Sequence, residues 1–335
     1  MLNIQPILDG DRLALARALT QIENGTPAGW DLLNALFPHT GRAHLIGITG
    51  APGTGKSSLV NQLARAYRAP LNGGSPKRVA ILAVDPSSPF TGGAILGDRI
   101  RMRDLSGDSG VFIRSMAARG ALGGISATTA AAAQAFDAAG YDVILIETVG
   151  AGQSEVDIAR LAHTTLVVEA PGLGDDIQAI KAGILEIADL LIVNKADHPG
   201  TEATERALKN MLQLAHPVAR VFNHHGVRET AAAATTSNAP LWIPPILRTV
   251  ATEAQGIAEV VQQISAHQAY LQSNGEWQQR ERERLQDELE RLIQATLWQR
   301  WREKVPPDLY PQTLQALQAR TISPHEAVQK LLPYA

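Results

Sequence analysis

Short apolar runs recur through the middle of the chain and are separated by longer stretches that are compatible with helices. The runs lie at residues 45–48, 79–84, 111–113, 143–146, 165–168 and 190–193. Continuous apolar runs of this length are typical of parallel strands that are covered on both faces. The pattern predicts an α/β fold with a doubly wound, mostly parallel sheet, and ligand chemistry at the carboxyl ends of its strands.

The first 40 residues show a helical pattern instead. They predict two short helices, the first with Leu15, Leu19 and Ile22 on one face. Thr26 and Pro27 are the residue types favoured at a helix N-cap and first turn, so we expect the second helix to begin there.

Beyond residue 251 the chain is expected to be helical to its end. Ser273 and Glu276 have the spacing of a capping box. Leu285, Leu289 and Leu292, followed by Thr296, form an apolar stripe at helical spacing. We therefore expect three parts: an N-terminal helical extension at 1–40, a core domain at 41–270 and a C-terminal helical extension at 271–335.

The periodic pattern is lost between residues 215 and 240, where we expect an exposed connection. The adjacent His224 and His225 fall in this segment. Because no third ligand is in view, we interpret them as solvated loop residues rather than as a metal site.

Composition narrows the class of protein. The chain has 335 residues, of which 45% are hydrophobic, enough for a substantial core. A formal net charge of −3 gives no electrostatic footprint for nucleic acid. The absence of cysteine excludes disulfides, thiolate zinc sites and cysteine nucleophiles. We see no signal peptide and no membrane span, and we expect a cytoplasmic protein.

A glycine-rich segment follows the first apolar run. Residues 50–57 match the phosphate-binding pattern G-x-x-x-x-G-K-[ST]. Its glycines let backbone N–H groups converge on one centre, and the next helix adds its own unsatisfied donors. The residues expected to hold a polyphosphate are Gly50, Ala51, Pro52, Gly53, Thr54, Gly55, Lys56, Ser57 and Ser58. Lys56 should reach the β- and γ-phosphates, and the Ser57 hydroxyl should bind Mg²⁺.

The run at 190–193 ends in a tetrapeptide that predicts the base of the nucleotide. Asn194, Lys195, Ala196 and Asp197 match the N-K-x-D pattern of guanine-specific GTPases. A carboxylate at this place accepts hydrogen bonds from guanine N1–H and the exocyclic amine, which adenine does not offer there. We therefore expect GTP rather than ATP. The loop expected to close over the guanine is formed by Thr249, Val250 and Ala251.

The run at 143–146 ends in Glu147 and, three residues later, Gly150. Most GTPases have Asp-x-x-Gly here, where the acid supports Mg²⁺ and the glycine N–H meets the γ-phosphate. Asp85 and Asp98 are two further carboxylates that could serve the metal directly or through water. An equally good interpretation of Asp98 is a helix N-cap.

The hydrolytic machinery looks incomplete. Ala151, rather than a glutamine, follows the glycine at the place where a Ras-like enzyme orients the attacking water. We therefore expect intrinsic hydrolysis to be slow.

Five segments together resemble the MeaB/ArgK GTPases, which act as chaperones of adenosylcobalamin-dependent acyl-CoA mutases such as methylmalonyl-CoA mutase. They are residues 50–57, 84–89, 92–102, 146–155 and 172–181. The resemblance extends over nearly the whole chain. It implies a P-loop GTPase of the signal-recognition/MinD/BioD-like class that is homodimeric through its helical extensions, with Asp85, Asp98 and Glu147 around Mg²⁺. It also implies that Gln178 and Lys181 lie in a switch that couples the mutase to GTP hydrolysis.

Three other functions are less consistent with the sequence. An arginine/ornithine-transport ATPase or kinase fits poorly, because the N-K-x-D pattern favours GTP and no base for a substrate hydroxyl is visible. A HypB-like nickel-delivery GTPase would need Cys and His ligands, and this chain has no Cys and no His-rich terminus. A translation GTPase would need an RNA-binding face, which the near-neutral charge does not support. The sequence does not identify which mutase is served.

Overall fold

A computed structural model of the protein describes residues 3–70, 73–86, 103–105, 107–118, 127–148, 154–172, 187–215, 222–224, 227–229 and 241–334. The chain forms two compact units, residues 1–281 and residues 282–335.

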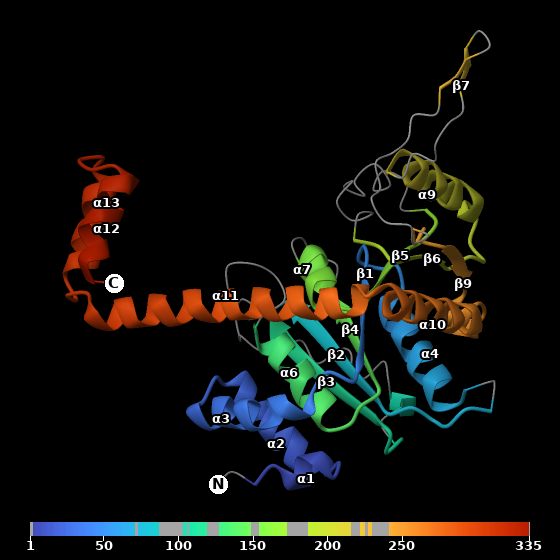
Figure 1. Cartoon of the computed structure of the whole chain (residues 1–335), viewed down its shortest axis with the longest axis horizontal. Helices are drawn as coiled ribbons and strands as arrows, with labels where there is room; N and C mark the ends of the chain where they lie inside the picture. The colour runs from blue at the N-terminus through green and yellow to red at the C-terminus, as the bar shows by residue number, and fades with distance from the viewer. Residues whose placement is uncertain are drawn as a thin grey trace. The chain divides into compact units, whose positions relative to one another are not determined.

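The first unit is built around a seven-stranded parallel sheet (Figure 1). Its strands are β1 (His44–Thr49), β2 (Val79–Pro86), β3 (Val111–Ala118), β4 (Val143–Thr148), β5 (Thr164–Glu169), β6 (Leu190–Asn194) and β9 (Ile246–Thr249). The strand order is β3-β2-β4-β1-β5-β6-β9. This confirms the doubly wound sheet predicted from the apolar runs.

Strand β4 lies between β1 and β2, although it follows both in the chain. In the register of the sheet, Ile48 pairs with Glu147, and Val84 pairs with Thr148. The carboxyl ends of β1, β2 and β4 therefore lie side by side. This edge is where ligands bind in open α/β sheets.

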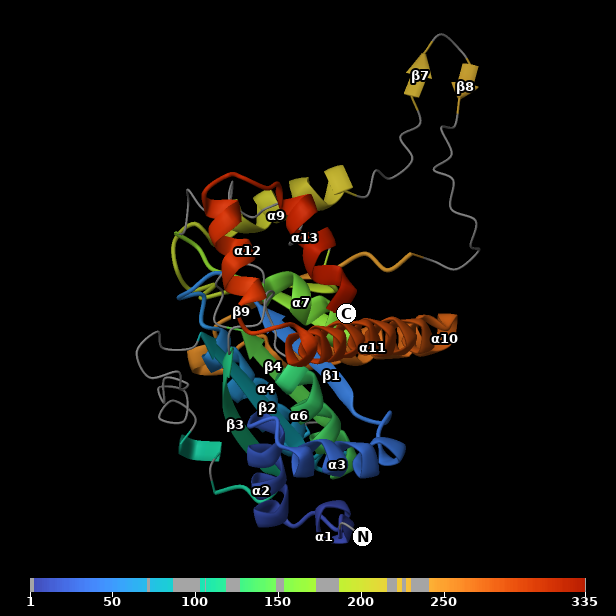
Figure 2. The same cartoon turned by 90° about the vertical axis from the view of Figure 1, so that its left-hand side faces the viewer.

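Helices cover both faces of the sheet (Figure 2). One face packs against α6 (Ala127–Ala138), α7 (Ser154–Leu161), α9 (Thr201–Ala215) and the N-terminal helices. The other face packs against α4 (Lys56–Arg68) and α10 (Ile257–Asn274). Alternate residues of each strand enter the two layers, so that Leu45 joins the first core and Ile46 the second.

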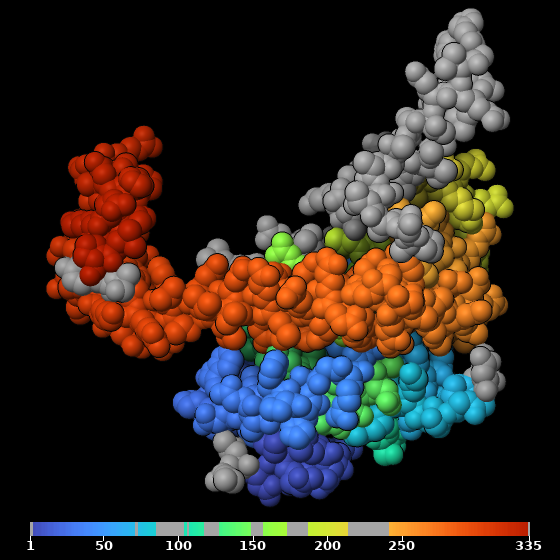
Figure 3. Space-filling view, in the orientation of Figure 1, coloured from blue at the N-terminus to red at the C-terminus, as the bar shows by residue number. Residues whose placement is uncertain are grey.

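The N-terminal residues form α1 (Gln5–Leu8), α2 (Arg12–Glu23) and α3 (Pro27–Leu36). The hydroxyl of Thr26 accepts from the N–H of Gly29 at 3.0 Å, which confirms the predicted N-cap. Arg114 of the edge strand β3 pairs with Glu23 of α2. The three helices, blue in Figure 3, are thus part of the first unit's core.

The second unit contains most of α11 (Glu276–Lys304), together with α12 (Leu309–Gln318) and α13 (Pro324–Leu331). Trp301 Nε1 donates to the Leu331 carbonyl at 2.9 Å and joins α11 to the end of α13. Leu289 and Leu297 of α11 are exposed in the single chain.

The predicted capping box at Ser273 is wrong. Helix α10 runs through Asn274 and ends at Gly275, whose φ is 83°, so that Ser273 lies in a last turn rather than before a first one. Its hydroxyl donates back to the Tyr270 carbonyl at 2.9 Å. The N–H of Glu276, at the start of α11, donates to the Asn274 side chain instead.

Parts of segment 215–240 lie outside the described residues. The parts that are described form an antiparallel pair, β7 (Phe222–His224) with β8 (Val227–Glu229). Short 3₁₀ turns complete the described elements: Phe37–His39, Arg103–Leu105, Ala251–Glu253 and Leu332–Tyr334. None of the helices described is both long and apolar enough to cross a bilayer.

Candidate functional site: the carboxyl edge of the sheet

The loop between β1 and α4 depends on two glycines that no larger residue could replace. Gly50 has a φ of 137°, and a Cβ added there would lie 2.0 Å from the Val168 carbonyl oxygen of β5. Gly55 has a φ of 90°, and its added Cβ would lie 2.3 Å from Asn194 Nδ2. Both positions need a residue without a side chain, because the loop passes directly over neighbouring strands.

Lys56, the first residue of α4, is buried with its ammonium group turned over the loop. Its Nζ donates to the carbonyls of Gly50 at 2.7 Å and Ala51 at 2.9 Å. Gly55 precedes the helix without a side-chain cap. The first N–H groups of α4 therefore face the loop together with a buried positive charge, an arrangement that attracts phosphate.

Ser57 and Glu147 meet beside this loop. The Ser57 hydroxyl donates to Glu147 Oε1 at 2.6 Å, and Glu147 is only 5% exposed at the end of β4. A hydroxyl and a carboxylate held together are oxygen donors of the kind that Mg²⁺ prefers, so these residues fit the expected metal. The described residues contain no group of three His, Cys, Asp or Glu side chains that could hold a metal by themselves.

The backbone of Asp85 lies at the same edge. It is the residue after Val84, which pairs with Thr148 of β4. Asp98, Gly150, Ala151, Gln178 and Lys181 lie outside the described residues, and their predicted roles stay predictions.

The side chain of Asn194 joins the phosphate loop to the predicted guanine loop. Its Nδ2 donates to the Thr54 carbonyl at 2.8 Å, and its Oδ1 accepts from the Thr249 hydroxyl at 3.0 Å and from the Ala251 N–H at 3.1 Å. All three partners were predicted site residues, and one buried amide brings them together. The sequence pattern did not reveal this bridging role. We call the set of three hydrogen bonds made by the Asn194 side chain the Asn194 clip.

Asp197 differs from Asn194 in being open to solvent. Lys195 between them has a φ of 56°, a left-handed conformation that turns the chain after β6. The Asp197 side chain is 52% exposed and lies 3.7 Å from His198 Nε2. The motif therefore contains one buried residue that joins the two loops and one carboxylate that is open to solvent.

A further contact at this edge was not foreseen from the sequence. The hydroxyls of Thr49 and Thr148, at the ends of the neighbouring strands β1 and β4, are hydrogen bonded at 3.0 Å and buried. The bond fixes the strand ends that carry the phosphate loop and Glu147. Threonine is common at strand ends, so no sequence signal would have distinguished this pair.

Comparisons with known proteins agree with this geometry. The model of the family described as "Methylmalonyl Co-A mutase-associated GTPase MeaB" matches residues 15–305. A Pyrococcus abyssi protein classed as a GTPase is 39% identical over 98% of this chain and 94% of its own length. The GTPase ArgK of Escherichia coli is 35% identical over 98% of this chain and 94% of its own length.

Among solved structures, one described as a LAO/AO transport system kinase matches with a TM-score of 0.68 and 27% identity. The match covers 99% of this chain and 95% of that one. The fold is therefore shared over almost the full length of both proteins.

Proposed function

The chain belongs to the MeaB family of methylmalonyl-CoA mutase-associated GTPases, and from this premise we propose that it is a GTP-hydrolysing chaperone of an adenosylcobalamin-dependent acyl-CoA mutase. Its role would be to assist loading, protection or reactivation of that mutase, such as methylmalonyl-CoA mutase. We keep the cytoplasmic location expected from the sequence.

The observation that best supports guanine nucleotide binding is the Asn194 clip. It ties Thr54 in the phosphate loop to Thr249 and Ala251 in the loop expected to cover the base. These hydrogen bonds join the two loops that we propose for the phosphates and for the base. Asp197 then supplies the accessible carboxylate that accepts from guanine N1–H and its amine.

Magnesium would bind at the Ser57 hydroxyl, supported by Glu147 and by the carboxylates of Asp85 and Asp98. Bound there, it would neutralise charge on the β- and γ-phosphates. Lys56 would leave the Gly50 and Ala51 carbonyls for the phosphate oxygens, since an ammonium group pairs more strongly with an anion than with a carbonyl. Gly50 to Ser58 would cradle the phosphates, and the Gly150 N–H would meet the γ-phosphate.

We propose that turnover by the free protein is slow and that the mutase stimulates it. Ala151 replaces a water-orienting glutamine, and Lys56 stabilises charge without activating water. Docking of the mutase would bring Gln178 or Lys181 to the γ-phosphate. One charge-assisted contact of this kind is worth roughly 10²–10³ in rate.

We also propose a homodimer in which residues from 275 onward form much of the interface. Leu289 and Leu297 present exposed apolar groups along α11, in a chain whose relatives share this region. Light scattering at micromolar concentration should show a dimer. A monomer under these conditions would contradict this part of the proposal.

Two experiments test the function. Calorimetry with purified protein should show micromolar GTP and GDP binding and much weaker ATP binding; equal affinity for ATP would contradict the guanine assignment.

GTP turnover should then be measured with and without the cognate mutase for the wild type, Gln178→Ala and Lys181→Ala. If both variants bind the mutase and keep full stimulation, the switch assignment is wrong.

The alternatives make different predictions in the same assays. A HypB-like protein would bind a transition metal, and a transport kinase would pass the γ-phosphate to a protein side chain rather than to water. Release of free phosphate at the rate of GTP loss would contradict the kinase.

A further inference from the structure

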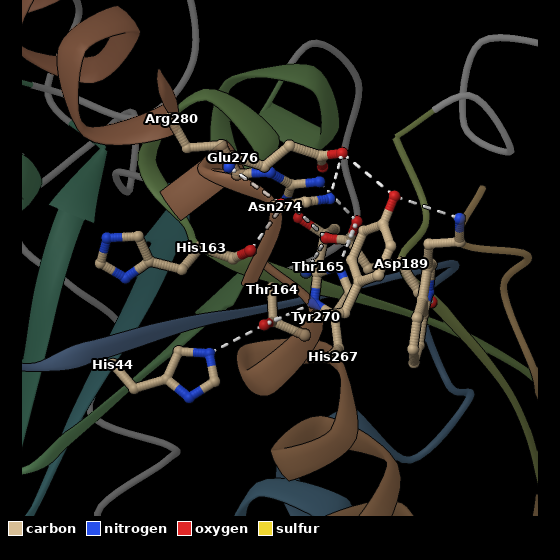
Figure 4. A network of polar contacts seen from close by, with 11 residues as sticks. His44, His163, Thr164, Thr165, Asp189, His267, Tyr270, Asn274, Glu276 and Arg280 are labelled. Atoms are coloured by element: carbon tan, nitrogen blue, oxygen red, sulfur yellow. Dashed lines mark hydrogen bonds and ion pairs between the residues drawn. The ribbon is translucent and has the colours of Figure 1, made fainter. Parts of the chain in front are cut away.

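Buried threonine hydroxyls link separate elements at several places in the first unit. Thr164, for example, lies between His44 and His267 at the amino edge of the sheet (Figure 4). Links of this kind join parts of the core. The hydroxyl of Thr201, by contrast, is bonded to the loop that carries Asp197, the residue proposed to recognise guanine.

The Asp197 loop, residues 195–200, connects the end of β6 to the start of α9. Lys195 and Gly200, at its two ends, both have left-handed backbone conformations, with φ of 56° and 94°. Residues 197–200 are all exposed, and a hollow of about 470 Å³ lies against the loop beside α9. Side-chain packing therefore contributes little to the shape of this loop, which depends on its hydrogen bonds.

Four backbone groups flank Asp197, two on the residue before it and two on the residue after it. The Ala196 N–H donates to the Thr249 carbonyl at 3.0 Å, and the His198 N–H donates at 2.9 Å to the carbonyl three residues before it. The carbonyls of Ala196 and His198 both accept from the Thr201 hydroxyl, at 3.2 Å and 2.8 Å. One hydroxyl thus closes the loop on both sides of the carboxylate.

Thr201 is the first residue of α9 and is only 6% exposed. An N-cap hydroxyl accepts from N–H groups of the first helical turn, whereas the Thr201 hydroxyl donates to carbonyls that precede the helix. Its one proton is shared between them, as in the three-centre bonds that are common at helix ends. The backbone around Asp197 is therefore held by a group outside the N-K-x-D pattern.

We propose that Thr201 is a positioning residue for guanine specificity, which acts by holding the Asp197 carboxylate in line with N1–H and the exocyclic amine of the base. The inference rests on the proposed GTPase function. Hydrogen bonds weaken steeply when donor and acceptor are misaligned, so a small displacement of the loop would reduce base recognition. Phosphate binding would be preserved, because the phosphate loop is bonded to Asn194, before the Asp197 loop begins.

The variant Thr201→Val tests this role, because valine has the shape of threonine and lacks the hydroxyl. Without a donor, the two carbonyls would turn toward water and move Asp197 with them. The preference for GTP over ITP measures the contact with the exocyclic amine, which inosine lacks. Calorimetry should show about a tenfold preference in the wild type, the ratio expected for one hydrogen bond to a charged group. Thr201→Val should reduce it to about threefold or less.

Three further variants assign the effect to the hydroxyl. Thr201→Ser keeps the donor and should keep the preference, whereas Thr201→Ala should lose it without placing a second methyl group in the loop. Thr204→Val is the matched control. Thr204 is 2% exposed, and its hydroxyl donates at 3.3 Å to the Gly200 carbonyl, which also accepts from two backbone N–H groups. This variant should keep the full preference.

ATP affinity does not depend on Asp197, so it should be equal in all variants and shows that each is folded with an intact phosphate loop. A full preference for GTP over ITP in Thr201→Val or Thr201→Ala would overturn the proposal. So would a loss of preference in Thr201→Ser, or an equal loss in Thr204→Val. Equal binding of GTP and ITP by the wild type would instead contradict the guanine assignment itself, and the role of Thr201 with it.

Discussion

The two edges of the same sheet are built by different means. At the carboxyl edge, a contiguous loop supplies backbone groups and glycines, and residues 50–57 carry most of the site. At the amino edge, side chains from separate segments meet: His44 from β1, His163 and Thr164 at β5, Asp189 before β6, and Arg280 from α11. One site follows from local sequence and the other only from the fold.

This difference has a physical origin. A phosphate loop must present several N–H groups to one anion, which is possible only for successive residues, so its signature is a motif. A buried ion pair must satisfy its charges with whichever groups the fold brings near, so its members need no fixed spacing. We therefore expect substitutions at the carboxyl edge to weaken nucleotide binding, and substitutions at the amino edge to lower the stability of the fold.

The largest expected effect is the loss of GTP affinity in the variant Gly50→Ala. The new Cβ would meet the Val168 carbonyl at 2.0 Å in a backbone conformation that L residues rarely adopt, so the loop cannot keep its shape. A penalty of about 3 kcal/mol would weaken GTP binding about 100-fold by calorimetry. The matched control is Gly53→Ala, where φ is 82° but no atom lies within 4 Å of the added Cβ; an equal loss there would contradict the steric argument.

Arg280→Met tests the opposite edge. It removes the bidentate partner of the buried Asp189, which should lower the free energy of unfolding by about 2–3 kcal/mol, below the usual loss for a buried pair because Arg280 is 30% exposed. GTP affinity should not change. Arg248→Met, which breaks an exposed pair with Glu205, should cost under about 1 kcal/mol in urea denaturation. If the two variants lost a comparable amount of unfolding free energy, burial would not explain the larger contribution expected from the Arg280–Asp189 pair.

A smaller effect should appear in the pH dependence of stability. Burial lowers the pKa of His44 from its ordinary value of 6.5 to about 3 in the folded protein, so the unfolded chain binds the extra proton between these values. Acidification through this window favours unfolding by about 1.4 kcal/mol per pH unit. His44→Phe should lose this component. A His44→Phe slope equal to that of the wild type would show that His44 is not buried in neutral form.

The smallest change in stability is expected for Asp197→Asn, because this side chain is 52% exposed. Its effect should fall on specificity alone, with a shift in preference toward xanthine nucleotides, since the amide can donate where the carboxylate could only accept. Competition between GTP and XTP measures this shift. Unaltered guanine preference would separate Asp197 from base recognition.

The fold was largely predictable because buried parallel strands leave continuous apolar runs, and β2, β4 and β6 lie where those runs are. The phosphate loop was predictable because its function dictates consecutive residue types. The Asn194 clip was only half predictable: the motif showed that the residue matters, but its partners Thr54 and Ala251 are far from it in the chain.

The amino-edge network gave no sequence signal. Single polar residues at the starts of strands, such as His44 and Thr164, are equally compatible with solvated loop ends. The prediction of a capping box at Ser273 was wrong for a related reason. The spacing of a serine and a glutamate does not show whether a helix begins or ends there. In the structure, the left-handed conformation of Gly275 ends helix α10. The residue type alone did not reveal this, because glycine also occurs before the start of a helix.

The position of β4 between β1 and β2 has a consequence for synthesis on the ribosome. Thr49 and Thr148, which are bonded in the finished sheet, are 99 residues apart in the chain. At usual translation rates of about 5–20 residues per second, β1 would wait about 5–20 s for this neighbour. We expect nascent chains stalled before β4 to be digested by protease and to recruit chaperones. Chains stalled well after β5 should resist digestion. They should retain guanine nucleotide only once β6 has also emerged.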